Sequence, residues 1–206
     1  TLRDSGKWID QVAWEQIFGK GCLGEQPIPQ PPTDMLAQME KLEERLNQEV
    51  MLVLVPETVN NQVLGLNTWK YLTKNFPGFE TTKFCNFNQE FLRPTKMHYV
   101  LLSSDNLHGS KDKTYKVHEF LATGKFRRMA TGQEITSAIL MRQALSGEEF
   151  QKKETRTSDS IASGSHLVIG YCEKQGLYSY YRKDELSDFG VVTALRLYTS
   201  SVTKAK

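Results

Sequence analysis

The chain has 206 residues, of which 39% are hydrophobic and 24% charged, and its formal net charge is +2. This length is sufficient for one large domain with its own core, and the composition excludes a chain that is disordered throughout. The near-neutral charge argues against a protein dedicated to nucleic acid, in which basic residues normally dominate. We therefore expect a single domain over residues 1–206. Because the chain begins at Thr1 without a methionine, we expect it to be a piece of a longer protein.

Cysteine usage and hydropathy indicate the compartment. The three cysteines, Cys22, Cys85 and Cys172, are odd in number and far apart, which predicts unpaired thiols in a reducing compartment and no zinc site. The sequence holds no apolar run long enough to span a membrane and no secretory signal pattern. These patterns predict a cytoplasmic protein without a cofactor.

The N-terminal elements follow from spacing and from residues that break secondary structure. Apolar residues at helical spacing predict a helix over 8–18, which the glycines of 19–24 end. The Pro-rich stretch 27–32 predicts an extended strap. An amphipathic helix is expected over 33–47, and the apolar run 50–55 predicts a buried strand.

The remaining elements alternate less regularly along the chain. Helical spacing predicts a helix over 66–76, and an apolar run predicts a strand over 97–102. Thr131 and Glu134 form a capping box that opens a helix to about Leu145. Residues 152–165, rich in Ser and Thr, predict a mobile polar loop. The predicted C-terminal strands are 166–172, 177–181 and 191–198.

The order of these elements predicts the fold class. Strands and helices occur in blocks and not in strict alternation, which favours an α+β fold. We expect one antiparallel sheet of about five strands, in which the strand at 50–55 joins a three-stranded C-terminal meander, and helices that lie mainly on one face.

Two kinds of ligand motif are tested and rejected. Gly19, Gly21 and Gly24 have the spacing of a dinucleotide-binding loop, but a helix precedes them and a proline strap follows, so the interpretation is a helix terminator. The four histidines lack the three- or four-residue spacing of helical metal ligands, so no metal site is predicted.

The polar loop 103–113 is the candidate for catalysis. Ser104, Asp105 and His108 supply a nucleophile, an acid and a base by type, and Lys111 and Lys113 could bind an anionic ligand. Members of a catalytic triad usually come from distant parts of a chain, however. A connector whose polar side chains bond to local backbone is the favoured interpretation, and a hydrolase or transferase is the alternative.

The stretch 111–128 mixes basic and aromatic residues, as single-stranded nucleic-acid sites do. Its candidate contacts are Lys125, Arg127 and Arg128. The competing interpretation, which the near-neutral charge favours, is a solvated helix whose aromatic residues face the core.

Five segments carry a resemblance: WEQIFG at 14–19, MLVLVPETV at 51–59, the stretch 98–115 from HYVLL to HGSKDKTY, LVIG at 167–170 and GVVTALR at 190–196. Together they resemble an uncharacterised domain family of chlamydia-related intracellular bacteria. The resemblance implies a self-contained module, part of a larger protein acting in or near a host cell, to which it would be delivered. It implies no activity and no site residue.

The first functional hypothesis is a non-catalytic module that binds a protein or a small ligand, because no catalytic, metal or phosphate motif outweighs its structural explanation. The sequence does not predict the partner or the oligomeric state.

Overall fold

The computed structural model describes residues 2–72, 83–84, 96–123, 127–148, 154–160, 164–172, 176–183 and 190–196. Its helices are α1 (Gln11–Phe18), α2 (Met35–Leu46), α3 (Leu66–Leu72), α4 (Tyr115–Ala122) and α5 (Gly132–Ser146). Its strands are β1 (Trp8–Ile9), β2 (Val50–Val55), β3 (Thr58–Val59), β4 (Gln62–Val63), β5 (Lys83–Phe84), β6 (His98–Ser103), β7 (Arg127–Met129), β8 (Thr155–Ser160), β9 (His166–Cys172), β10 (Gly176–Arg182), β11 (Gly190–Val191) and β12 (Thr193–Arg196).

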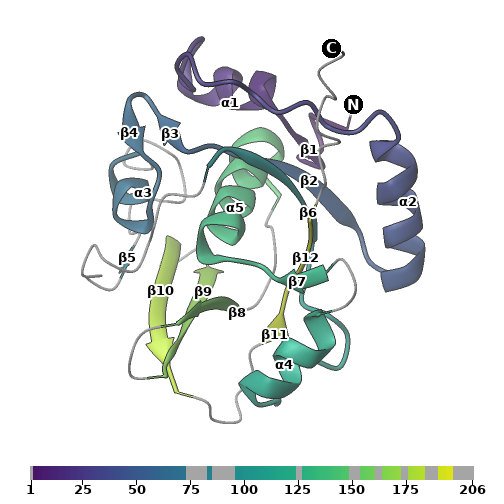
Figure 1. Ribbon diagram of the computed structural model, residues 1–206. Helices are drawn as coiled ribbons and strands as arrows, with labels where there is room; N and C mark the ends of the chain where they lie inside the picture. The colour runs from purple at the N-terminus through teal and green to yellow at the C-terminus, as the bar shows by residue number, and fades with distance from the viewer. Residues whose placement is uncertain are drawn as a thin grey trace, which may run out of the picture.

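The strands form two five-stranded sheets and a small hairpin, β3–β4 (Figure 1). The first sheet has the order β1-β2-β6-β12-β7 and the second has the order β11-β8-β9-β10-β5. The α+β class is therefore confirmed, but the prediction of one sheet with a C-terminal meander is wrong. Only β9 and β10 pair as the predicted antiparallel hairpin. The last predicted strand is split, because β11 pairs with β8 while β12 pairs with β6 and β7.

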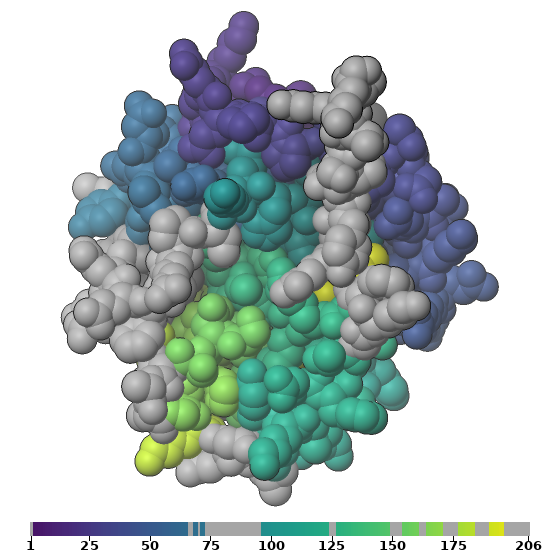
Figure 2. All heavy atoms as spheres, viewed as in Figure 1, coloured from purple at the N-terminus to yellow at the C-terminus, as the bar shows by residue number. Residues whose placement is uncertain are grey.

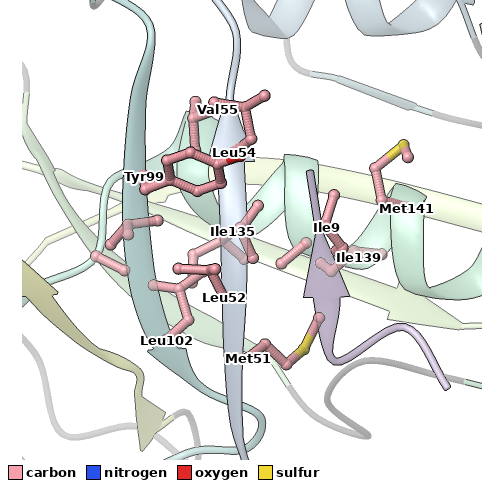
Figure 3. Close-up of a cluster of buried hydrophobic side chains, with 14 of the residues drawn as sticks. Ile9, Met51, Leu52, Leu54, Val55, Tyr99, Leu102, Ile135, Ile139 and Met141 are labelled. Carbon is pink, nitrogen blue, oxygen red and sulfur yellow. The ribbon is translucent and has the colours of Figure 1, made fainter. Parts of the chain in front are cut away.

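Helix α5 lies between the two sheets (Figure 1). The predicted capping box is confirmed, since the Thr131 side chain accepts a hydrogen bond from the Glu134 backbone amide and the Glu134 carboxylate accepts one from the Thr131 amide. Every residue from Gly132 to Arg142 is buried, as expected for a helix packed on both sides. Figure 3 shows side chains of α5 beside those of the first sheet.

The two faces of the first sheet have different covers. Helix α5 packs on one face, and α2 lies on the opposite side of β2 (Figure 1), which is why all six residues of β2 are buried. The prediction that helices lie mainly on one face is therefore wrong. The strap at 27–32, between α1 and α2, extends the cover of the α2 side.

Two segment predictions need correction. The predicted helix at 8–18 begins only at Gln11, because Trp8 and Ile9 pair with β2 and Asp10 is the N-cap. The predicted mobile loop at 152–165 contains β8, whose first three residues are buried between β9 and β11. Because its residues are polar, this strand, which lies between two others in the second sheet, was not predicted from hydrophobic periodicity.

One hydrophobic core joins residues of both sheets and of α5, among them Val53, Ile139 and Ile169. None of the described helices combines the length and the apolar character that a bilayer crossing demands.

Candidate functional site

A pocket of about 350 Å³ opens beside the first turn of α1, next to the first sheet. Its volume lies at the lower end of the range for small-ligand sites. Three segments that are far apart in the sequence form it: the N-terminal segment, the strap and the start of β6. The lining residues are Arg3, Trp8, Asp10, Gln11, Val12, Ile28, Pro29, Gln30, Pro31 and Tyr99.

Strand register places the two aromatic walls. Trp8 pairs with Leu52, and Tyr99 pairs with Leu54, two residues further along β2. Directly paired residues lie on the same face of a sheet, and residues two apart on a strand do so as well. Trp8 and Tyr99 therefore project to the same side, which is the side away from α5. The strap closes the pocket with Ile28, Pro29 and Pro31, and the ring-fixed φ angles of the two prolines make this wall stiff.

The charges in the pocket neutralise one another. Arg3 donates from Nε to Oδ1 of Asp10 at 3.1 Å and from Nη2 to Oδ2. The hydrogen bond that Arg3 donates to Asp10 raises the pKa of Arg3. Asp10 also caps α1, because Oδ1 accepts from the backbone amide of Ala13 at 3.0 Å. The pair is thus engaged in structure and leaves the lining without net charge.

Tyr99 supplies a polar group next to this pair. It is 7% exposed, and burial, with a smaller effect of the Asp10 charge, raises the pKa of its phenol to about 12. The hydroxyl therefore keeps its proton at physiological pH and can both donate and accept a hydrogen bond. The pocket thus combines apolar and aromatic side chains with the polar groups of Tyr99, Gln11 and Gln30, an arrangement that can bind a small ligand.

The predicted catalytic loop is placed elsewhere, between β6 and α4. Ser103 donates to the backbone carbonyl of Asp105 at 3.0 Å, and Asp105 accepts from the backbone amide of Asn106 at 2.7 Å. His108 is exposed, and no described hydrogen bond joins it to Ser104 or Asp105. The geometry does not support the catalytic set. Lys111 and Lys113 are exposed and do not line the pocket beside α1.

The same loop covers a polar network that sequence reasoning missed. Tyr178 and Tyr180 donate to the two carboxylate oxygens of Glu154 at 3.0 and 2.6 Å. Asn106 donates to the Glu154 carbonyl at 3.1 Å and accepts from Thr155. Alternating tyrosines on a strand were the available signal. Glu154 accepts hydrogen bonds from both tyrosine hydroxyls and from Asn106 of the loop. The network is therefore explained by the packing of the loop on the second sheet.

Of the predicted nucleic-acid residues, the structure describes Arg127 and Arg128. Arg128 donates to both carboxylate oxygens of Glu134, one of them at 2.7 Å, and Glu134 is 1% exposed. Arg127 is half-buried, and Lys125 lies outside the described residues. Arg128 therefore pairs with the first turn of α5, and nucleic-acid contact through Lys125, Arg127 and Arg128 stays a prediction.

The structure also bears on the predictions for the glycines at 19–24, the cysteines and the metal ligands. Gly19 is the C-cap of α1, and Gly19, Gly21 and Gly24 all have positive φ, so the helix-terminator interpretation is confirmed. Cys22 is unpaired and buried. Cys85 lies outside the described residues, and so does the side chain of Cys172. Among the described residues, no group of three potential ligands could hold a metal ion.

Comparisons with known proteins leave the family open. No family model matches the chain, and neither the curated proteins nor the solved structures provide a match. The resemblance to the domain family of chlamydia-related bacteria therefore stays a prediction.

Proposed function

We propose that this domain is a non-catalytic binding module whose pocket holds a small, uncharged ligand with an aromatic ring. The observation that carries the proposal is the composition of the lining. Trp8, Tyr99 and the strap form apolar walls, and the only charges are the mutually paired Arg3 and Asp10. A charged ligand would have to disrupt this pair, which also caps α1, whereas a neutral ligand would not.

Binding accounts for the pocket better than catalysis does. General acid–base or nucleophilic chemistry needs a base within reach of a nucleophile. The carboxylate in the pocket is Asp10, and its Oδ1 accepts from both Arg3 and Ala13. The hydrolase or transferase hypothesis has no support from a base placed within reach of a nucleophile among the described residues. The resemblance in sequence would place the module in a protein that acts in or near a host cell, which is a separate prediction.

The test uses saturation-transfer NMR with four small aromatic probes: indole, 2-naphthol, benzoate and benzylamine. We expect the two neutral probes to bind and the two charged probes to bind at least about tenfold more weakly. Val12 lines the pocket and is 52% exposed, so Val12→Trp can narrow the pocket without disturbing the core. It should weaken indole binding at least about tenfold. A single hydrogen bond is worth about 0.5–1.5 kcal/mol, so Tyr99→Phe should weaken 2-naphthol by about two- to tenfold.

Gln16→Trp is the matched control, because Gln16 is an exposed residue of the same helix that does not line the pocket. It should leave indole binding unchanged. Equal binding of all four probes, or indole binding that survives Val12→Trp, would overturn the proposal.

A further inference from the structure

Helix α4 lies at the end of the molecule opposite α1 (Figures 1 and 2), and exposed basic and aromatic residues occur on it and around it. We call this surface the α4 face. It consists of exposed side chains before and on α4 and one at the end of β10: Lys111, Lys113, Lys116, Val117, Phe120 and Arg182.

The tertiary fold brings these side chains together. The rings of Tyr115 and His166 stack with their centroids 3.4 Å apart and an interplanar angle of 9°. This contact fixes the first turn of α4 against the start of β9. His166 pairs directly with Arg182 of β10, so both lie on the face of the second sheet that α4 approaches. Lys116, which follows Tyr115 in the chain, and Arg182, which pairs with His166, are therefore both brought near this aromatic stack.

The exposed apolar residues on α4 are unusual for a solvent-facing helix. Phe120 is 80% exposed and Val117 is 38% exposed, while His118 and Ala122 hold the opposite side of the helix to the protein. Lys116 and Phe120 are four residues apart and lie on the same side of α4. An aromatic ring beside an ammonium group can stack on a base while the cation neutralises a phosphate.

We propose that the α4 face binds single-stranded nucleic acid. Among its described residues, the acidic side chains Asp112 and Glu119 are outnumbered by the four cations. The surplus of positive charge is complementary to a phosphate backbone. This face lies partly within the stretch predicted at 111–128, but it uses the lysines at 111–116 and Arg182 in place of Lys125, Arg127 and Arg128. It is also independent of the proposed small-ligand pocket.

The experiment measures fluorescence anisotropy of a labelled twelve-nucleotide oligo-dT over a series of salt concentrations. For single strands, the slope of log K against log salt changes by about 0.7 for each phosphate neutralised. Lys113→Ala/Lys116→Ala should therefore weaken binding and reduce the slope by about 1.4. The exposed pair Lys20→Ala/Lys41→Ala is the matched control and should leave both quantities unchanged.

The aromatic contribution is tested at constant charge. Phe120→Ala should weaken oligo-dT binding at least about fivefold at every salt concentration, with no change in slope. Tyr71→Ala removes another exposed aromatic residue, 72% exposed on α3, and should have no effect. The proposal is overturned if oligo-dT does not bind. It is also overturned if Phe120→Ala binds normally and poly-glutamate of equal charge competes as well as unlabelled oligo-dT, since the surface would then bind any polyanion.

Discussion

Replacing Glu134 by Gln tests how the buried charges at the start of α5 support the fold. The Glu134 carboxylate accepts hydrogen bonds from Arg128, from His98 Nε2 at 3.0 Å and from the backbone amide of Thr131 at 2.8 Å. Glu134→Gln keeps the size of the side chain but removes its charge, and it leaves the Arg128 guanidinium without a neutralising partner.

The magnitude follows from the electrostatics of this site. Burial alone raises the pKa of Glu134, but the hydrogen bonds from Arg128 and His98 outweigh it and lower the pKa from 4.5 to about 2. At 1.36 kcal/mol per pH unit this difference corresponds to about 3 kcal/mol. Breaking a buried ion pair by removing one partner costs about 3–5 kcal/mol in other proteins. We therefore expect Glu134→Gln to lower the free energy of unfolding by about 3 kcal/mol at pH 7.

Urea denaturation followed by circular dichroism measures this loss, and its pH dependence gives a second readout. A carboxylate with a lowered pKa stabilises the fold fully above the unfolded pKa of 4.5, and this stabilisation is lost as the pH falls towards 2. The difference between wild type and Glu134→Gln should therefore shrink over that range. Glu119→Gln, an exposed glutamate on α4, is the control and should change stability by less than about 0.5 kcal/mol. A loss below about 0.5 kcal/mol for Glu134→Gln at pH 7 would refute the reasoning.

Three further predictions concern single residues. Burial alone would lower the pKa of His98, but the hydrogen bond with the Glu134 carboxylate outweighs it and raises the pKa. The contribution of protonated His98 to stability should therefore be complete below pH 6.5 and lost as the pH rises through the folded pKa. An NMR titration of the imidazole measures that folded pKa. Gly170→Ala should destabilise by about 1–3 kcal/mol in thermal unfolding, because a Cβ would lie 2.5 Å from the Tyr178 ring, whereas Gly65→Ala meets no neighbour and should have little effect. Burial raises the pKa of Cys22 to about 11, so Cys22→Ser should leave the number of fast-reacting thiols in the folded protein unchanged.

The sequence by itself determined those elements whose signals are local. The capping box at Thr131 and the glycines after α1 depend on interactions within a few residues, and the structure contains both features. Helix α2 and strand β2 were readable because their apolar residues repeat with the period of one element.

Only the tertiary structure decided which strands share a sheet. Pairing is a contact between distant residues, and the sequence of a strand does not name its partner. The chain passes from the second sheet at Val191 to the first at Thr193, so one predicted strand serves two sheets. Polar β8 is a strand because β9 and β11 supply its backbone hydrogen bonds, which hydrophobic periodicity does not record.

The candidate sites, too, were decided only by the tertiary structure. The pocket joins Arg3, Trp8, the strap at 28–31 and Tyr99, and no two of these segments are neighbours in a motif. The α4 face joins Lys116 and Arg182 across 65 intervening residues through the contact between Tyr115 and His166. Residue types along the chain identified lysines and aromatics as candidates, but burial and ion pairing decided which of them face solvent, because those properties arise only when the two sheets close around α5.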